Sequence, residues 1–585
     1  MKKKIADLAQ QVSWGSKIPG WLLNLGERFL GFHQLNVAHS HIEEDWDKGS
    51  KDNFFSLACK YIPLKYELSG LENIPKEGPC VIVCNHPHGM SDGLMFGDIA
   101  MKVRSDVRIV VNEWLRCVRG MQPYEITVDV YGGEAAKRAN MAGMREILQW
   151  LRAGHCILVF PSGSAASYSH QDRRVVDDPW QTNIAGIIRK TGATVVPMHI
   201  AGRTGLLFQL FTILCKQHRA ALLAREIKRD SRTLHTIRLG KPITPSAIAR
   251  FETDTALSDF LRLSSMMLQY IPQHSSLRTN EELPREMKPI EPKEDEETLA
   301  QEMAALPAEA LLYAHESSGL NVYCVTAAQI PHMLHEIGVQ REITFRAVGE
   351  GSGTSCDLDD YDYHYDHLVM WDPAKKKLAG AYRMGRTDLI TREKGAKGIY
   401  NSLFFNLGSR FIEEMSQGVE MGRAFITAAY QRHPAALDTL WMGIGHFLNR
   451  YPQYRYLYGT VSISADYTKA SRALMLSYLK SQCMLEELSP HISAKHPPLE
   501  MELRSEDARL LPTAVADVRA LTALVNALEP DGKGIPVLLR QYLRLGGRMV
   551  SFGVDKDFGN TLDCMVIVDM QNANRRIVER YRGKY

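Results

Sequence analysis

The chain has 585 residues, enough for two to four domains at roughly 100–200 residues each. Its composition, 45% hydrophobic and 23% charged, excludes collagen-like, coiled-coil and wholly disordered proteins. The net charge of +3 hides an asymmetry, because residues 1–280 carry 35 basic and 26 acidic side chains whereas residues 281–585 carry 35 and 41.

The N-terminal residues predict neither a secretion signal nor a spanning helix. Asp7 and several polar residues interrupt the apolar core that a signal peptide needs. No stretch of the chain reaches the roughly 18 predominantly apolar, uncharged residues of a membrane span. Residues 14–32 favour an amphipathic helix that lies in a lipid interface or packs on its own domain. The ten cysteines lack paired spacing, so we expect a reducing cytosol, no disulfide framework and no structural zinc.

Upstream of residue 280, short β-rich runs alternate with longer helical segments. The predicted strands are Cys80–Cys84, Val107–Val111, His155–Pro161 and Thr194–His199, and the predicted helices include 134–153 and 180–191. This alternation is typical of an α/β domain with a largely parallel sheet, which we place at 1–280.

Residues 281–297 carry three prolines and eight acidic residues with little to bury, and they predict an acidic, proline-containing linker over 281–300. Beyond it, the predicted strands are 366–371, 378–384, 423–428 and 456–464, and the predicted helices are 407–417, 435–450 and 466–480. Residues 301–585 therefore predict a second, mixed α+β domain. No internal repeat is visible, so the two domains are different modules.

Two histidines and an aspartate come directly after the predicted strand Cys80–Cys84. They are His86, His88 and Asp92 in the run NHPHGMSDG. An imidazole at a strand end can take a proton from a hydroxyl at neutral pH, and a carboxylate bonded to its other nitrogen fixes the tautomer. The same arrangement also occurs in purely structural turns, so spacing alone leaves both interpretations open.

This run resembles the His–Asp motif of the glycerolipid acyltransferases. FPSG at Phe160–Gly163 is similar to the FPEG block of that superfamily, VVPMHIAGR at Val195–Arg203 to its last block, and DDPW at 177–180 to its hemolysin-like branch. The resemblance implies acyl transfer to a hydroxyl, with His86 as the base and Asp92 orienting it. It also implies substrate contacts from Ser162, Gly163 and Arg203.

Two departures from the family pattern matter. The family has four residues between the His and the Asp, whereas five separate His86 from Asp92 and three separate His88 from Asp92, so His88 stays an alternative base. Ser162 replaces the Glu of FPEG, a residue that in the family helps to bind glycerol phosphate. This replacement favours a different hydroxyl acceptor.

A run of basic residues follows the last block of this domain. It suits an anionic leaflet or an acidic acyl carrier protein, and it can equally be a solvated helical face. Nucleic acid is not expected as a partner, because no stacking aromatic residues interleave with these charges. The basic residues are Arg219, Arg225, Lys228, Arg229, Arg232 and Arg238.

The second domain concentrates acidic residues within 342–372. Their spacing is not that of a calcium loop and no His/Cys set accompanies them, so we expect no metal site. Glu420 and Arg423 follow at the start of a predicted strand. Such a pair can accept a proton from an amine and orient a neighbour, or it can be a salt bridge.

Several motifs together resemble the acyl-homoserine-lactone synthases and the ornithine N-acyltransferases, which have a GNAT-like fold. The closing block at 533–569 resembles the end of the hemolysin-like N-acyltransferases. The other motifs are FR at 345–346, the cluster Asp360, Asp362 and Asp366, YR at 382–383, and ExGR at 420–423.

This resemblance implies roles for individual residues. Asp362 and Asp366 would hold the side-chain amine of a cationic amino acid, and an Arg such as Arg383 or Arg423 would hold its carboxylate. Glu420 would be the base for the α-amine, and Arg346 would contact substrate. No acetyl-coenzyme A signature of the RxxGxG type is present, so the expected donor is an acyl carrier protein thioester, with acyl-CoA as the alternative and no bound cofactor.

Both resemblances together are those of a bifunctional ornithine-lipid synthase, with a glycerolipid-acyltransferase-like α/β domain followed by a GNAT-like α+β domain. The expected partners are acyl carrier protein, ornithine, a lyso-lipid acceptor and the membrane surface, at the cytoplasmic face of the bacterial inner membrane. Three alternatives stay open. They are an aminolipid synthase for glycine, glutamine or lysine, a lysophospholipid acyltransferase with a separate N-acyltransferase, and a membrane-binding protein with degenerate sites.

Overall fold

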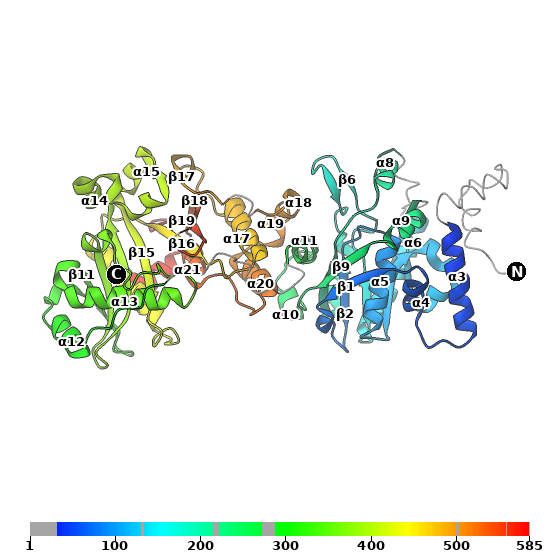
Figure 1. Ribbon diagram of the computed structural model, residues 1–585, viewed down its shortest axis with the longest axis horizontal. Coiled ribbons are helices and arrows are strands. Elements are labelled where there is room, and N and C mark those ends of the chain that lie inside the picture. Colours follow the sequence, from blue (N-terminus) through cyan, green and yellow to red (C-terminus); the bar gives the residue numbers. More distant parts are fainter. Residues whose placement is uncertain are drawn as a thin grey trace. The chain divides into compact units, whose positions relative to one another are not determined.

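The computed structural model describes residues 32–129, 134–214, 222–271, 287–498, 502–556 and 558–583. The chain divides into two compact units (Figure 1). Unit 1 comprises Met1–His274 together with Arg504–Ala520, and unit 2 comprises Ser275–Leu503 and Leu521–Tyr585. The predicted amphipathic helix at 14–32 lies outside the described residues, apart from Phe32.

Two features of this division differ from the predicted domains. Residues 296–300 of the predicted linker open helix α12 (Glu296–Ala304), because Asp295 caps its first turn and Leu299 and Met303 are buried in the core of unit 2. The linker was predicted from its many acidic residues, and that prediction did not take account of Leu299 and Met303. Arg504–Ala520, predicted as part of the second domain, belongs to unit 1.

Unit 1 is built on a seven-stranded sheet in the order β1-β9-β8-β2-β5-β3-β4. Strands β8, β2, β5, β3 and β4 run parallel to one another, whereas β8 and β9 are antiparallel. The strands are β1 (Lys65–Ser69), β2 (Cys80–Cys84), β3 (Val107–Asn112), β4 (Glu125–Val128), β5 (Cys156–Val159), β8 (Thr194–Ile200) and β9 (Leu234–Leu239). The α/β prediction is confirmed.

The apolar strand β2 is buried along its whole length, as its sequence CVIVC predicts. Its Cys80, Ile82 and Cys84 share a core with side chains of α4 and α5. The helices of unit 1 are α3 (Phe32–Asp47), α4 (Phe54–Tyr61), α5 (Met90–Met101), α6 (Glu134–Arg152), α7 (Thr182–Thr191), α8 (Leu206–Leu214), α9 (Leu223–Asp230), α10 (Pro245–Ile248), α11 (Asp254–Met267), α18 (Ser505–Ala508) and α19 (Leu511–Ala514). A short hairpin, β6 (Ser167–Ser169) and β7 (Arg174–Val176), completes the unit.

The parallel order brings three sequence motifs to one edge. The carboxyl ends of adjacent parallel strands lie at the same edge of a sheet. Strand β2 pairs with both β5 and β8. The segments that follow these strands, beginning at Asn85, Phe160 and Ala201, therefore meet, and they contain the three motifs singled out in the sequence.

The segment Arg504–Ala520 joins unit 1 through α18 and α19, and α19 lies beside α11 (Figure 1). Asp507 accepts hydrogen bonds from the hydroxyl of Tyr270 and the amide of Gln269, each at 3.0 Å. Arg509 pairs with Asp172 at 2.6 Å. These contacts fix the segment to the N-terminal α/β unit.

Unit 2 is built on an eight-stranded sheet in the order β10-β11-β12-β13-β15-β16-β19-β18. All neighbours are antiparallel except β15 and β16. The strands are β10 (Leu311–Ala314), β11 (Asn321–Thr326), β12 (Asp366–Asp372), β13 (Lys377–Arg386), β15 (Gly418–Ile426), β16 (Tyr456–Ile463), β18 (Arg548–Asp555) and β19 (Thr561–Asp569).

The parallel pair β15 and β16 separates along its length. Gly418–Glu420 pair with Tyr456–Tyr458. Beyond these residues β15 continues along β13 and β16 continues along β19. A wedge therefore opens between two neighbouring strands at the centre of the sheet.

Helices cover both faces of this sheet. Met333 and Ile337 of α13 pack with Val369 and Phe425 on one face. Gly443 of α16 lies against Leu368 on the other face. The helices are α12, α13 (Pro331–Arg346), α14 (Thr387–Lys394), α15 (Ser409–Glu414), α16 (Ala436–Arg450), α17 (Lys469–Gln482), α20 (Val518–Leu528), α21 (Val537–Leu545) and α22 (Arg575–Arg582), with a small sheet of β14 (Phe405–Leu407) and β17 (Ile492–Ala494).

The predicted elements of unit 2 are mostly found. The strand predicted at 423–428 begins earlier, at Gly418, and the helix predicted at 407–417 shortens to α15 between β14 and a 3₁₀ turn. The mixed α+β prediction is confirmed. In the part of the chain that the structure describes, no helix has the length and apolar character needed to cross a membrane.

Candidate active sites

The first candidate site is centred on His86 and Asp92, where β2 ends and α5 begins. Oδ2 of Asp92 accepts hydrogen bonds from Nδ1 of His86 at 3.1 Å and from the backbone N–H groups of His88 and Gly89 at 2.9 and 3.0 Å. Gly89 has φ of 70°, a conformation that glycine adopts without strain. The buried carboxylate lies in the first turn of α5, where the helix dipole favours a negative charge.

His86 is held so that one ring nitrogen stays available. Its ring stacks on Phe160 with centroids 4.0 Å apart. Its backbone N–H donates to Asp177 at 3.1 Å and its carbonyl accepts from Ala166 at 2.8 Å. Among the described residues, none hydrogen-bonds to Nε2 of His86. With Nδ1–H donated to Asp92, Nε2 carries the lone pair that a general base needs.

His88 is in a different situation, because both of its ring nitrogens face acceptors. Nδ1 lies 3.2 Å from Oδ1 of Asp230, and Nε2 lies 3.1 Å from the carbonyl oxygen of Ala201. Burial alone would lower the pKa of His88, but the hydrogen bond to Asp230 and the charge of Asp92 raise this pKa to about 9. A doubly donating imidazolium has no lone pair to offer, so the geometry favours His86 over His88 as the base.

Asp230 is a functional neighbour that the sequence did not reveal. It lies at the end of α9 inside the basic run, and its Oδ2 accepts from the Ser91 hydroxyl at 2.7 Å. Gly202 supports the same arrangement, since a Cβ at this position would come within 2.4 Å of His88 Nε2. The one hint in the sequence was that Asp230 is an acidic residue between Arg229 and Arg232 of the basic run.

Asp177, the first residue of DDPW, supports the loop that carries His86. Besides the His86 N–H, it accepts from the Trp180 indole N–H at 3.2 Å. Burial raises the pKa of Asp177 to about 6. The DDPW motif thus positions the backbone beside the base.

The FPSG segment forms a turn in which the N–H of Gly163 donates to the carbonyl of Phe160 at 2.9 Å. Ser162 is buried and its hydroxyl donates to the carbonyl of Ser164 at 3.0 Å, so it serves its own loop. The turn therefore places Phe160 against His86. Arg203, at the end of the last motif, is exposed next to the site.

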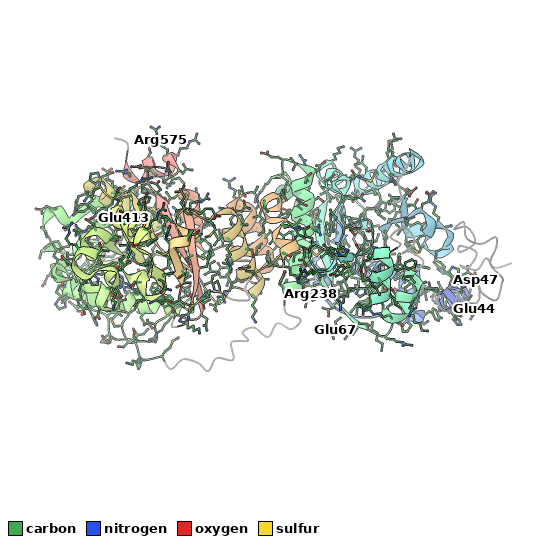
Figure 2. All side chains as sticks on the ribbon, turned by 90° about the horizontal axis from the view of Figure 1, so that it is seen from above. Glu44, Asp47, Glu67, Arg238, Glu413 and Arg575 are labelled. Atoms are coloured by element: carbon green, nitrogen blue, oxygen red, sulfur yellow. The ribbon has the colours of Figure 1, made fainter. Side chains whose placement is uncertain are left out.

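The basic run does not form one solvated face. Arg238, which is labelled in Figure 2, belongs to β9. It is buried, its guanidinium donates to the carbonyl of Leu268 at 3.3 Å, and burial lowers its pKa. Lys228, Arg229 and Arg232 are exposed. Arg219 lies outside the described residues.

In unit 2, Glu420 lies inside β15 rather than at its start, next to the residues where β15 and β16 separate. It is buried and accepts hydrogen bonds from the Tyr365 hydroxyl, from the N–H of Tyr400 at 3.0 Å and from the N–H and side-chain amide of Asn401 at 2.7 and 2.6 Å. Burial outweighs these bonds and raises the pKa of Glu420. Because both oxygens are engaged, the geometry fits a positioning role better than that of a base in contact with an amine.

Asp362 is not available to bind an amine, because two arginines occupy it. Its carboxylate is fully buried and lies 2.9 Å from Arg341 and 3.2 Å from Arg383. Burial opposes its charge, but the two guanidinium groups lower the pKa of Asp362. Arg383 also pairs with Asp359 at 2.6 Å. Nε and Nη2 of Arg383 have no partner among the described residues.

Asp366 lies on the other face of the sheet from Arg383. Successive strand residues point to opposite faces, and Asp366 pairs in register with Met384 whereas Arg383 pairs with His367. Asp366 binds Arg386 at 2.7 Å. This geometry does not support the predicted joint role of Asp362 and Asp366 in holding an amine. Asp360 opens the 3₁₀ turn over Asp360–Tyr363.

Arg423 occupies a bulge of β15 with φ of 52°. A positive φ at a non-glycine residue is strained and often marks a functional site. Its guanidinium lies 3.4 Å from Asp357 and packs against the rings of Tyr400 and Phe558 at 5.3 and 5.2 Å. The predicted pair of Glu420 with Arg423 is not a salt bridge, since each has other partners.

Arg346 has a local role. It donates to Glu342 at 2.6 Å and to the carbonyl of Thr354 at 2.5 Å, while Glu342 also accepts from the N–H groups of Ser352 and Gly353. These bonds shape the loop that follows α13. The predicted substrate contact of Arg346 has no support in this geometry.

Three carboxylates that sequence reasoning missed lie near the wedge, Glu350 and Asp466 on loops and Asp563 on β19 opposite Ser462 of β16. Asp563 accepts from Ser462 at 2.8 Å, and burial raises its pKa to about 7. Burial, followed by the charges of Asp563 and Asp466, raises the pKa of Glu350 to about 7. These residues come from three distant segments, so no local spacing announces them. We call Glu350, Asp466 and Asp563 the acidic trio.

One further group has the residue types of a metal site. The ligand atoms of Glu291, His335 and Cys356 lie within 4.8 Å of one another. His335 is already bonded to Glu291 at 2.9 Å and to Glu294 at 2.8 Å. These contacts account for the cluster as a polar network that joins residues 291–294 to α13.

Comparisons with known proteins agree with the folds of both units. The family described as "Acyltransferase" matches residues 8–242, and the family "Acetyltransferase (GNAT) domain" matches residues 340–442. A glycine N(alpha)-acyltransferase of Bacteroides thetaiotaomicron is 32% identical over 43% of the chain and 77% of its own length. A lyso-glycine lipid O-acyltransferase of Phocaeicola vulgatus is 26% identical over 40% and 86%. An L-ornithine N(alpha)-acyltransferase of Brucella abortus is 22% identical over 48% and 97%.

These sites and matches define an enzyme that transfers acyl groups, with an acyltransferase-like N-terminal domain and a GNAT-like C-terminal domain. Such a pairing places the chain among the acyltransferases of aminolipids. The chain belongs to the family of the glycine N(alpha)-acyltransferase of B. thetaiotaomicron.

Proposed function

We propose that the chain makes a complete two-chain aminolipid. Unit 2 would form an amide between an amino acid and a 3-hydroxyacyl chain, and unit 1 would then esterify the free hydroxyl of that chain. The observation that carries the proposal is the presence of two acyl-transfer folds in one chain, the first with an intact His86–Asp92 pair. The relatives named above also divide into N-acyltransferases and O-acyltransferases.

In the proposed O-acylation, Nε2 of His86 takes the proton of the lipid hydroxyl as its oxygen attacks the thioester carbonyl. The C–S bond then breaks, and the imidazolium returns the proton to the leaving thiolate. Asp92 stabilises the transient positive charge on His86 through Nδ1. Such catalysis contributes about 10²–10⁴-fold in rate. Ser162 in place of Glu is consistent with an acceptor that lacks glycerol phosphate.

In the proposed N-acylation, the thioester enters the wedge between β15 and β16 and the amine attacks its carbonyl. Glu350 is the side chain we propose as the proton acceptor, since it is half-buried and its pKa is about 7. The proton then passes to the leaving thiolate. Glu420 positions Tyr365, Tyr400 and Asn401 beside the point where the strands separate.

We propose ornithine as the amino acid. Within the acidic trio, its second ammonium would bind the carboxylates of Asp466 and Asp563, neither of which forms a salt bridge with a lysine or arginine among the described residues, while Glu350 accepts the proton of the attacking amine. The carboxylate of ornithine would bind the unpartnered nitrogens of Arg383 or Arg423. Glycine is the second candidate, because the relatives named for glycine are 32% and 30% identical, against 22% for those named for ornithine.

The acyl donor and the place of action complete the proposal. We propose an acyl carrier protein thioester as the donor, with acyl-CoA as the alternative. We also propose that the enzyme attaches peripherally to the cytoplasmic face of the inner membrane, where its lipid product belongs. The exposed Lys228, Arg229 and Arg232 are suited to either an acidic carrier or an anionic leaflet.

The experiment is expression in a bacterial host that lacks aminolipids, followed by mass spectrometry of its lipids. We expect a two-chain ornithine lipid from the wild type and a one-chain amide from His86→Ala. The exposed His170 of the β6–β7 hairpin provides a matched control, and His170→Ala should behave as the wild type.

Other outcomes would change or refute the proposal. A two-chain glycine lipid would retain the mechanism and replace the head group. A rise in phosphatidic acid with no new aminolipid would refute N-acylation, and a two-chain product from His86→Ala would refute the role of His86.

A further inference from the structure

Helix α8 exposes an apolar face, unlike a normal surface helix. Its sequence is LLFQLFTIL, and the four outward side chains are large and apolar. Leu206, Leu207, Leu210 and Ile213 have exposed fractions of 76%, 52%, 56% and 48%. Surface helices of water-exposed proteins present charged and polar residues on this side. The solvent that suits such a face is hydrocarbon.

The buried side of α8 carries Phe208 together with the polar residues Gln209 and Thr212. The side-chain amide of Gln209 donates to the Thr204 hydroxyl and to the carbonyl of Ala166, and its oxygen accepts from the N–H of Tyr168 at 2.8 Å. Thr212 is buried and donates back to the carbonyl of Phe208 at 2.8 Å. These bonds lock the orientation of the helix, so the apolar residues cannot simply rotate inward.

Basic side chains lie at the N-terminal end of this helix. Arg203 is exposed three residues before α8 begins. The guanidinium of Arg229 donates to the Arg203 carbonyl at 2.9 Å, which places α9 against the start of α8. Lys228 and Arg232, which neighbour Arg229 in sequence, are exposed. An apolar surface beside exposed cations complements an anionic lipid leaflet, with its acyl chains below and its negative head groups above.

We propose that α8 is the element of unit 1 that inserts into an anionic membrane surface, with Lys228 and Arg232 at the head groups. The helix is joined to the candidate active site by a short chain of bonds, because Gln209 holds Ala166 and the N–H of Ala166 donates to the His86 carbonyl at 2.8 Å. Insertion of α8 would hold His86 at the interface, where the hydroxyl of a one-chain lipid lies. Only the placement of His86 beside a lipid hydroxyl rests on the proposed function; the insertion of α8 into a membrane surface does not.

The test is co-sedimentation of the purified full chain with vesicles of phosphatidylcholine, alone or mixed with phosphatidylglycerol. We expect the wild type to bind the mixed vesicles. The variant L206Q/L210Q/I213Q should bind them about tenfold or more weakly, because three apolar side chains no longer leave water. Its thermal unfolding should match that of the wild type, since the replaced side chains are exposed.

Two controls separate the contributions. Met141 on α6 has the same exposed fraction as Leu210, 56%, so Met141→Gln should bind as the wild type whereas Leu210→Gln binds more weakly. Lys228→Gln with Arg232→Gln should weaken binding to mixed vesicles and leave binding to phosphatidylcholine unchanged.

Two results would overturn the proposal. The first is wild-type vesicle binding by the folded triple variant. The second is self-association of the wild type without lipid that the triple variant loses, since a second copy would then cover α8. Vesicle binding is measured without acyl donor, so a failure of the proposed acylation would leave this result unaffected.

Discussion

Replacing His88 by Gln tests which of two neighbouring histidines performs the chemistry of unit 1. His88 is 3% exposed and bonded to Asp230 and to the Ala201 carbonyl. Its pKa of about 9, against an ordinary 6.5, corresponds to about 3 kcal/mol of stabilisation of the folded state. Removing one partner of a buried pair costs about 3–5 kcal/mol. We therefore expect His88→Gln to lower the free energy of unfolding of unit 1 by about 3 kcal/mol.

The same pair predicts how stability depends on pH. A pKa raised by folding stabilises the folded state fully below the unfolded value of about 6.5, and the stabilisation is lost as pH rises through about 9. Wild-type unit 1 should therefore lose stability across this window. His88→Gln should lack this loss, because the titrating group is gone.

The assay combines urea unfolding, followed by tryptophan fluorescence at several pH values, with O-acylation of a one-chain lipid. His86→Gln should reduce O-acylation by about 10²–10⁴-fold and change the free energy of unfolding by less than about 1 kcal/mol. If His88→Gln is as stable as the wild type and loses O-acylation as fully as His86→Gln, then His88 is the base and our interpretation of its charge is wrong.

Four further variants test the remaining assignments. Asp92→Asn should lower O-acylation by about 10²–10⁴-fold and accumulate the one-chain amide, because the His86 tautomer is no longer fixed; full O-acylation by mass spectrometry would contradict this. Glu420→Gln should lower the free energy of unfolding of unit 2 by about 1–3 kcal/mol, since an amide NH₂ would face backbone donors; normal denaturant stability with no N-acylation would instead make Glu420 a direct participant. The rate of N-acylation should fall as pH decreases through about 7, as Glu350 with its pKa of about 7 is protonated, and Glu350→Gln should lose this inflection; an unchanged pH profile would rule out Glu350. Asp563→Asn should raise KM for ornithine by about tenfold and leave KM for glycine unchanged; equal changes would show that Asp563 does not discriminate between them.

The parts of the site that follow β2 could be predicted because they are local in sequence. CVIVC reads as a buried strand, and parallel strands present their carboxyl ends at one edge, so His86 and Asp92 were expected to lie at a sheet edge. Asp230 could not be predicted in the same way. It reaches His88 only because α9 packs beside α5, and no spacing along the chain encodes that contact.

The acidic residues of unit 2 show a second limit. Asp362 and Asp366 are four apart, a spacing that suggests a joint role, but Asp362 lies in a 3₁₀ turn and Asp366 is the first residue of β12. Asp366 then faces away from Arg383 because strand residues alternate. The residues that do gather at the wedge, Glu350 and Asp563, are more than 200 positions apart in the chain. The composition predicts an acidic second domain, but it does not predict which of its carboxylates lie close together in the fold.

The docking of Arg504–Ala520 on α11 and Tyr270 has a consequence for how the two activities can be separated. A gene cut at the linker would give an N-terminal fragment without the helix that covers α11, and a C-terminal fragment with that helix left unpaired. Dividing this chain into two independently folded proteins would thus require more than a new stop and start codon. The chain returns to its first unit after forming most of its second, so neither unit is a single continuous segment of the sequence.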